Sequence, residues 1–307
     1  MKKEFNFVSS DGITNINCVS WECENPKGVI QISHGISEYI ERYDEFAKYF
    51  NELGYIVVGN DSIGHGNSVS VEKGPMYFGG ENSYEYLIKD TYTLYNTIRE
   101  KYIDIPYYML GFSLGSFVMR CLVIQKQINI DGLILVGSGH NSNIEIQLGK
   151  FMCKLELKKH KDNEVTDKIN DLAINAHNKK FKNTRTCMDW LCSNEEAIDT
   201  YLNDSRIKKD YTIGIFRELL NSMSFACDKK NISKMYKKTP VLFLSGSDDA
   251  VGGFTKGVKK TYNMFKKCGV ENIDMKLYPN LRHDLFHEKN NKEIFDDIEK
   301  WLIQTRK

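Results

Sequence analysis

The chain has 307 residues, of which 41% are apolar and 27% are charged, and its formal net charge is +1. This composition is typical of a soluble globular protein with a large core, and its balanced charge gives no support for a nucleic-acid partner. The N-terminus lacks the apolar core of a secretory signal, and no run reaches the roughly 18 apolar residues of a membrane-spanning helix.

Eight cysteines are scattered along the chain without a C-x-x-C pair. This usage favours free thiols in a reducing cytoplasm and speaks against a zinc site. There is also no phosphate-binding or dinucleotide-binding glycine motif. We therefore expect a cytoplasmic protein with no metal and no cofactor.

Short apolar strands alternate with amphipathic helices through most of the chain. An antiparallel hairpin is expected first, at 4–8 and 16–23 around the turn SSDG. The further strands are expected at 28–33, 55–60, from 107 to the glycine at 111, 132–136, 240–245 and 273–278. Helices are expected at about 38–53, 84–102, 114–125, 254–267 and 291–304. This alternation predicts a mostly parallel sheet with helices on both faces and right-handed crossovers.

The alternation stops between Gly137 and Pro240, where about a hundred residues show no convincing buried strand. A crossover needs only a dozen or more residues. An insertion at the carboxyl end of a strand lies over the ligand crevice. We therefore predict a core of residues 1–139 and 236–307 and a helical cap of residues 140–235.

The most informative stretch is the apolar run that contains Gly111-Phe112-Ser113-Leu114-Gly115. A strand, a glycine-flanked serine and an apolar helix together are typical of the nucleophile elbow of α/β-hydrolases. A structural turn that happens to carry serine is the alternative. A base and an acid elsewhere in the chain would distinguish a nucleophile from a structural serine.

A serine nucleophile needs a histidine base, and the base needs a carboxylate that orients it. In this fold the chain order is serine, acid, histidine. His283 follows the last strand, and Asp248 or Asp249 follows the strand before it, so the order is met. Spacing alone leaves the choice between Asp248 and Asp249 open.

The other histidines fit catalysis poorly. His34 and His65 precede the serine in glycine-rich loops, which favours structural roles. His287 is expected at the start of the last helical region. The three in the insertion are expected at the surface; they are His140, His160 and His177.

The oxyanion of an acyl-transfer intermediate needs preorganised N–H donors. One donor is expected from Leu114, the residue after the serine. The other is expected from Ile36, in the loop where His34 and Gly35 let the backbone turn inward.

These loops together resemble the monoacylglycerol lipase and lysophospholipase branch of the α/β-hydrolases. The motifs that carry the resemblance are HGISEYIERY, DSIGHGNS, GFSLGS, SGSDDAVGG and YPNLRHDLFHE, in this order from residue 34 to 288. Within the insertion, an Arg-Thr pair followed by Trp-Leu is similar to the cap of a bacterial subfamily.

The resemblance implies a role for each matching residue. The nucleophile falls on Ser113, the base on His283 and the acid on Asp249. The oxyanion donors fall on Ile36 and Leu114. The supporting oxyanion loop falls on His34, Gly35 and Glu38, the glutamate that braces it. Two positions depart from the family: Ala250 replaces a common proline, and Asp284 replaces the usual glutamate, which puts its positioning role in doubt.

The resulting hypothesis is a serine carboxylester hydrolase that acts on a small-molecule substrate, the ester of a single-chain lipid, which is either a monoacylglycerol or a lysophospholipid. The lipid class is implied by the resemblance alone. A serine peptidase or aminopeptidase of the same fold is the main alternative, and a non-catalytic ligand-binding member is a further one.

The start of the cap has an amphipathic pattern with apolar Ile144, Leu148, Phe151, Met152 and Leu155. Five lysines against one glutamate occupy residues 150–161. One interpretation is an ordinary helix packed on the core with a solvated lysine face. The other is an apolar wall for an acyl chain, with lysines that make transient contact with an anionic membrane surface.

Overall fold

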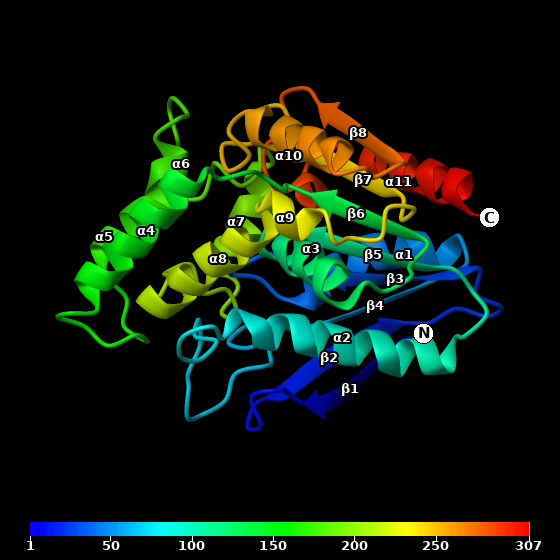
Figure 1. Ribbon diagram of the computed structural model, residues 1–307, viewed down its shortest axis with the longest axis horizontal. Coiled ribbons are helices and arrows are strands. Elements are labelled where there is room, and N and C mark those ends of the chain that lie inside the picture. Colours follow the sequence, from blue (N-terminus) through cyan, green and yellow to red (C-terminus); the bar gives the residue numbers. More distant parts are fainter. Residues whose placement is uncertain (307) are drawn as a thin grey trace.

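The computed structural model describes residues 1–306, which fold around one eight-stranded sheet (Figure 1). The strands lie in the order β1-β2-β4-β3-β5-β6-β7-β8. The predicted hairpin is confirmed, since β1 pairs antiparallel with β2, and β2 pairs antiparallel with β4. All other neighbouring strands are parallel. The bounds are β1 Lys2–Val8, β2 Asn15–Trp21, β3 Gly28–Ser33, β4 Tyr55–Asn60, β5 Tyr107–Phe112, β6 Gly132–Val136, β7 Val241–Gly246 and β8 Ile273–Tyr278.

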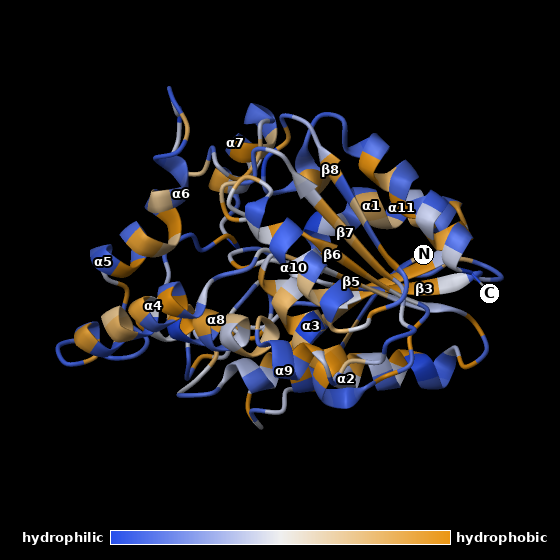
Figure 2. Ribbon diagram, turned by 45° about the horizontal axis from the view of Figure 1, so that its top comes forward, coloured by the Kyte–Doolittle hydropathy of each residue, from blue (hydrophilic) through white to orange (hydrophobic). Residues whose placement is uncertain are grey.

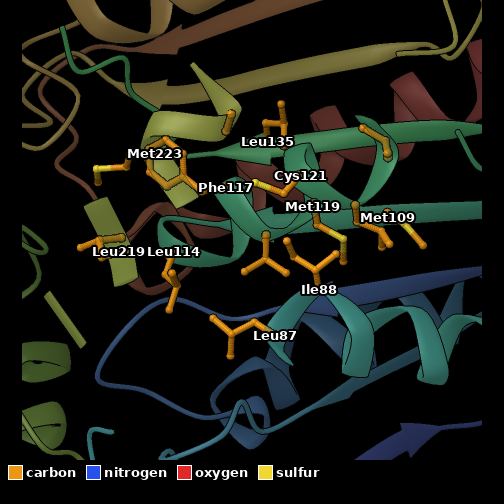
Figure 3. Packing of buried hydrophobic residues seen from close by; sticks show 14 of the residues in the cluster. Leu87, Ile88, Met109, Leu114, Phe117, Met119, Cys121, Leu135, Leu219 and Met223 are labelled. Carbon is orange, nitrogen blue, oxygen red and sulfur yellow. The ribbon is translucent and has the colours of Figure 1, made fainter. Parts of the chain in front are cut away.

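Both faces of the sheet are covered, and β5 shows why. Its side chains alternate between two buried clusters, with Tyr107 and Met109 on one face and Tyr108 and Leu110 on the other, as the two-residue period of a strand requires. Figure 3 shows the first face, where helices α2 and α3 pack on the sheet. The helices of that face are α2 Tyr84–Lys101, α3 Leu114–Lys126 and α10 Lys256–Lys267, and those of the opposite face are α1 Asp44–Glu52 and α11 Asn291–Thr305.

The single helix predicted at 38–53 is wrong at its start. The structure has a short 3-10 helix, η1 (Ile40–Tyr43), followed by α1. The N–H of Ile40 donates to Asp61 Oδ1 at 2.8 Å, and Glu38 accepts from the N–H of Gly35, so the residues before Ile40 stabilise a loop. Gly54 ends α1 with φ +85°, the left-handed conformation that glycine commonly adopts just after a helix.

Between β6 and β7 the chain is helical, and residues 137–240 contribute no strand beyond a bridge between Val165 and Thr212. Figure 1 shows α4, α5 and α6 at the left, away from the sheet. Helix α8 packs on α3 and α4, so its apolar side joins the core (Figure 2). The bounds are α4 Asn143–Glu156, α5 Asp167–Asn170, a π-helical turn η2 Asp171–Asn175, α6 Ala176–Asn178, α7 Glu195–Asn203, α8 Ile213–Ala226 and α9 Lys229–Ile232.

Arg120 of α3 fastens this segment to the core. Its side chain is fully buried, and its guanidinium donates to the carbonyl of Gly139 at 3.2 Å and to the carbonyl of Ala226 at 2.7 Å. The first carbonyl lies where the segment begins, and the second ends α8, where the helix dipole favours a cation. One side chain therefore contacts both the start of the segment that follows β6 and the end of α8.

Among residues 1–306, no helix combines the length and apolar composition needed to cross a bilayer. All eight cysteines are free thiols.

Candidate active site

Ser113 occupies a strained turn between β5 and α3. Its backbone has φ +49° and ψ −114°, a combination that non-glycine residues rarely adopt. The flanking glycines are sterically required, because a Cβ on Gly111 would lie 2.5 Å from the carbonyl oxygen of Gly115. A Cβ on Gly115 would lie 1.9 Å from the carbonyl oxygen of Ser33. The turn lifts the half-buried serine to the floor of a cavity.

The loops after β7 and β8 bring Asp249 and His283 together. Asp249 is fully buried, and its Oδ1 lies 2.9 Å from Nδ1 of His283 and accepts from the N–H of Gly252 at 2.9 Å. Burial acts to raise the pKa of Asp249, but the charge and hydrogen bond of His283 hold it below its usual range. Asp248 instead accepts from Ser247 Oγ at 2.9 Å. Of the two aspartates, Asp249 is therefore the one in contact with the histidine.

His283 lies close to the elbow. Its ring centroid is 5.0 Å from that of Phe112, and a Cβ on Gly137 would come within 2.8 Å of its Cε1. The N–H of Ser113 donates to the carbonyl of Val136, the neighbour of Gly137, at 3.0 Å. Within residues 1–306 no hydrogen bond joins Ser113 to His283, which is common before substrate binds.

The loop of His34 to Glu38 reaches the same cavity. The N–H of Gly35 donates to Glu38 Oε1 at 2.5 Å, and the hydroxyl of Tyr43 donates to the same oxygen at 2.9 Å. Ile36 lines the cavity beside Ser113. In the part of the chain that is described, the N–H groups of Ile36 and Leu114 have no acceptor, so both are available to an oxyanion.

His34 and His65 have structural contacts. His34 Nε2 accepts from the N–H of Ser62 at 2.9 Å, which leaves Nδ1 as the donor to the carbonyl of Gly35 at 2.6 Å. Burial and the nearby His34 lower the pKa of His65 to about 3, so its ring is neutral. Both rings thus support the loops beneath the cavity.

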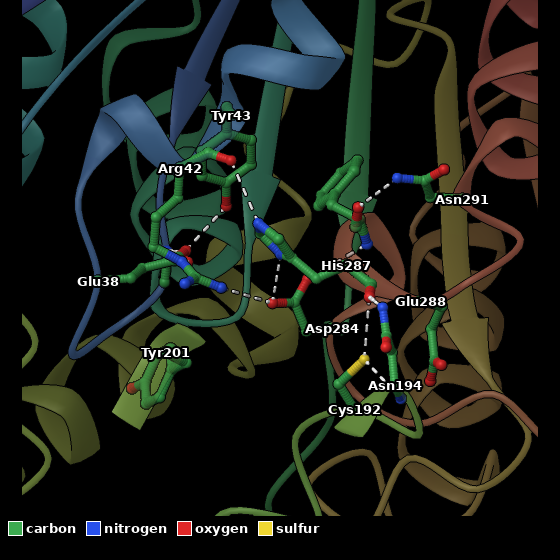
Figure 4. Close-up of polar contacts among 12 residues, drawn as sticks. Glu38, Arg42, Tyr43, Cys192, Asn194, Tyr201, Asp284, His287, Glu288 and Asn291 are labelled. Atoms are coloured by element: carbon green, nitrogen blue, oxygen red, sulfur yellow. Dashed lines mark hydrogen bonds and ion pairs between the residues drawn. The ribbon is translucent and has the colours of Figure 1, made fainter. Parts of the chain in front are cut away.

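A buried charge network joins the loop of residues 34–38 to the loop that carries His283 (Figure 4). Arg42 contacts Glu38 through Nε at 3.2 Å and Asp284 through a terminal nitrogen at 3.4 Å. His287 Nδ1 lies 2.7 Å from Asp284, and its Nε2 donates to the carbonyl of Arg42 at 3.2 Å. Burial would raise the pKa of Asp284, but His287 and Arg42 hold it below its usual range.

This network was only partly predictable. The four-residue spacing of Glu38 and Arg42 was a usable signal for an ion pair. The contact of Arg42 with Asp284 spans 242 residues and had no local signal. His287 lies in the 3-10 helix η3 (Leu285–His287) rather than at the start of the last helix, because Asp284 caps this turn through the N–H of Phe286.

The cavity above Ser113 has a volume of about 260 Å³. Most of its walls are apolar, and no lysine or arginine of residues 1–306 lines it. The apolar walls come from α3, α4, η2 and α8, together with two loop residues; they are Ile36, Phe117, Leu148, Gly149, Met152, Leu172, Ala173, Phe216, Leu219, Leu220, Met223 and Val251. The polar positions are Ser113, Asn141, Glu145, His177, Trp190 and Tyr211.

The prediction that the three histidines of the insertion lie at the surface is correct for His160 only, whose side chain is 39% exposed. His140 and His177 are partly buried. His177 lines the cavity and packs on Trp190 with ring centroids 5.3 Å apart. Burial, followed by the nearby His283, lowers the pKa of His177 to about 4.

Helix α4 does not pack on the core with its apolar stripe, as one of the two interpretations predicted. Ile146 and Cys153 are buried, whereas Ile144 is 82% exposed and Phe151 is 54% exposed. Leu148 is 61% exposed, yet together with Met152 it borders the cavity. The apolar stripe of α4 is therefore divided between solvent and cavity, because Gly149 lets α8 approach the opposite side of the helix.

Within residues 1–306, no group of three or more His, Cys, Asp or Glu side chains is arranged so that it could hold a metal ion.

The sheet order, the parallel crossovers and the serine turn after β5 make this protein an α/β-hydrolase. Residues 24–290 match the family described as "Serine aminopeptidase, S33", and the chain belongs to that family. The predicted fold is thereby confirmed.

Similar proteins extend over nearly the whole chain. The "Monoglyceride lipase homolog" of Monkeypox virus is 25% identical over 295 residues, 95% of each chain. "Phospholipase YtpA" of Bacillus subtilis is 25% identical over 277 residues, 90% of this chain and 95% of the relative. The thermostable carboxyl esterase of Bacillus coagulans has a TM-score of 0.91 at 23% identity, covering 99% of this chain and 98% of that one. These findings confirm the predicted resemblance, and the protein is a carboxylic ester hydrolase.

Proposed function

We propose that this hydrolase cleaves the ester of a single-chain lipid, with a monoacylglycerol as the favoured substrate. The observation that carries the proposal is the apolar cavity directly above Ser113. Its walls suit a hydrocarbon chain, which binds by leaving water. Relatives named as monoglyceride lipases and as a phospholipase support the same substrate class.

The proposed chemistry uses Ser113 as nucleophile, His283 as base and Asp249 as the group that orients the imidazole. His283 takes the serine proton as Oγ attacks the ester carbonyl, and the same proton then passes to the leaving alcohol oxygen. The N–H groups of Ile36 and Leu114 stabilise the oxyanion. Water, activated by His283, then releases the fatty acid from Ser113.

Charge favours a monoacylglycerol over a lysophospholipid. A phosphate ester is bound most readily by arginine or lysine. The charged side chain on the cavity wall is instead Glu145, whose Oε2 accepts from the N–H of Ser142 at 2.7 Å. An acid at the wall would repel a phosphate, so a neutral head group fits better.

A substrate panel tests the proposal. Monoacylglycerols and lysophosphatidylcholines of increasing chain length are assayed with the wild type and Ser113→Ala. We expect measurable kcat/KM on monoacylglycerols, lower values on the phospholipids, and loss of at least about 10³-fold in the variant. Retention of most activity by Ser113→Ala would refute the assignment.

The main alternative is a peptidase, as the family's description suggests. An aminopeptidase must bind the free ammonium group of its substrate. The carboxylate at the cavity wall, Glu145, is already engaged with Ser142 in the cap of α4, which disfavours this alternative. Aminoacyl anilides assayed beside acyl esters decide between the two. Labelling of Ser113 by a fluorophosphonate separates either enzyme from a non-catalytic binding protein.

We also propose that residues 140–235 form a cap whose outer apolar side makes transient contact with a membrane. Ile144 and Phe151 are exposed, and Lys154 and Lys158 lie exposed on the same segment. Such a combination favours an anionic lipid surface. Binding to vesicles with and without anionic lipid tests this, with Phe151→Ser expected to weaken binding. Equal, negligible binding to both vesicles would refute it. The cytoplasmic location stays a prediction.

A further inference from the structure

The cavity wall carries two buried polar groups that have no partner within residues 1–306: Nε1 of Trp190 and Nδ1 of His177. Trp190 is only 5% exposed. The other two tryptophans are satisfied, since Trp21 donates to Asp44 at 2.9 Å and Trp301 donates to Asp274 at 3.0 Å. Leaving a buried polar group without a hydrogen-bond partner costs about 1–3 kcal/mol. Two such groups on the wall of one cavity therefore indicate that a ligand supplies their partner.

Their position fits the alcohol part of an ester. The ring centroid of Trp190 lies 5.7 Å from that of His283, and the ring centroid of His177 lies 5.3 Å from that of the same indole. A base that returns its proton to the leaving oxygen must have the alcohol beside it. The two unpaired groups therefore border the space that the leaving alcohol occupies.

We propose that Trp190 and His177 bind a free hydroxyl of the alcohol portion of the substrate. The inference rests on the proposed function and adds the feature by which glycerol esters are distinguished from simple alkyl esters. Indole nitrogen can only donate, whereas a neutral imidazole nitrogen can accept. One hydroxyl that accepts from Trp190 Nε1 and donates to His177 Nδ1 satisfies both groups.

The burial of His177 keeps it in the form that this role requires. With its pKa lowered to about 4, the ring is neutral at pH 7 and retains a lone pair. An alkyl alcohol of similar size would fill the space and leave both nitrogens unpaired. Sites built around such hydrogen bonds discriminate against analogues that lack the hydroxyl.

The test compares two esters of one acyl chain, 1-monooctanoylglycerol and methyl octanoate. The readout is the ratio of their kcat/KM values, which a general loss of folding or of catalysis leaves unchanged. Trp190→Phe keeps an aromatic ring and removes the N–H, and we expect the ratio to fall about threefold to tenfold. His177→Leu should lower the ratio similarly, and the double variant should add little, because one hydroxyl serves both groups.

Trp301→Phe is the matched control. It removes an indole N–H that donates to Asp274 and does not line the cavity, so the ratio should stay at the wild-type value. A wild type that cleaves both esters, with a ratio unchanged in Trp190→Phe and His177→Leu, would overturn the hydroxyl site and leave the proposed function intact. A wild type inactive on both esters would refute the proposed function and the site with it.

Discussion

Replacing Arg42 by methionine should both destabilise the protein and slow its catalysis. The side chain is 8% exposed and is shared by Glu38 and Asp284, which are 3% and 2% exposed (Figure 4). Removing the cation leaves two buried carboxylates without their shared partner. Breaking a buried ion pair in this way costs about 3–5 kcal/mol of unfolding free energy.

The catalytic loss follows from what Glu38 does. Its Oε1 holds the N–H of Gly35, next to the proposed donor Ile36. Outright loss of an oxyanion donor costs about 10²–10³-fold in kcat, and a loosened loop should cost less, about tenfold. KM should change little, because Arg42 does not line the cavity.

The pH dependence gives a second signature. The pKa of Asp284 is below its usual range in the fold, so its contribution to stability is present above the unfolded pKa and is lost as the pH falls through the folded value. Without Arg42, Asp284 takes up its proton at a higher pH. The stability difference between wild type and variant should therefore shrink as the pH falls from 7 toward 4.

The assays are urea unfolding at several pH values and p-nitrophenyl ester turnover. Arg206→Met is the matched control, since it removes an arginine that is 38% exposed and paired with Glu41. An exposed pair contributes about 0–1 kcal/mol. Two results would refute the reasoning. One is an unfolding free energy of Arg42→Met within about 1 kcal/mol of that of the control, which is the contribution of an exposed pair. The other is a kcat of Arg42→Met equal to that of the wild type.

Two further predictions concern stability. Arg120→Met should lower the unfolding free energy by about 1–3 kcal/mol, because the buried carbonyl of Ala226 loses its donor, whereas that of Gly139 keeps the hydroxyl of Thr261 at 3.0 Å; urea unfolding that matches wild type would contradict it. For His65, whose pKa is lowered to about 3 by burial and by His34, the unfolded chain binds the extra proton below about pH 6.5. Stability should thus decrease as the pH falls from 6.5 to 3. In this pH range, His65→Asn should reduce the slope of unfolding free energy against pH by the equivalent of about one proton. Equal slopes for wild type and variant would contradict this prediction.

Local chemistry made much of the fold predictable. In β5 every residue is buried, and its apolar run preceded a serine between glycines, so strand, turn and helix could be placed from the sequence. The order of Ser113, two candidate aspartates and His283 followed from the chain order of the fold. Their assigned roles stay predictions, although Asp249 and His283 do contact each other.

Long-range packing decided the features that the sequence did not reveal. The helix at 38–53 begins late because Asp61 takes the N–H of Ile40, a contact 21 residues away. The apolar stripe of α4 suggested which side would be buried, but small Gly149 opposite Leu220 placed the other side against α8. Burial of His177 depended likewise on where Trp190 lies, and no local pattern encodes that position.

The distribution of charge suggests two separate recognition steps. Lysines of α4 and the turn after it, such as Lys154 and Lys158, lie exposed on the outside of the inserted helices, whereas no lysine or arginine of residues 1–306 lines the cavity. Exposed cations act on an anionic surface within about a Debye length, roughly 8–10 Å. In the proposed membrane contact they attract the lipid surface, and they lie outside the cavity that would hold a substrate phosphate. Inside the cavity, apolar walls and the unpaired groups of Trp190 and His177 favour a neutral chain that ends in a hydroxylated alcohol. A change of an outer lysine should accordingly alter vesicle binding without altering the preference between two soluble short-chain esters.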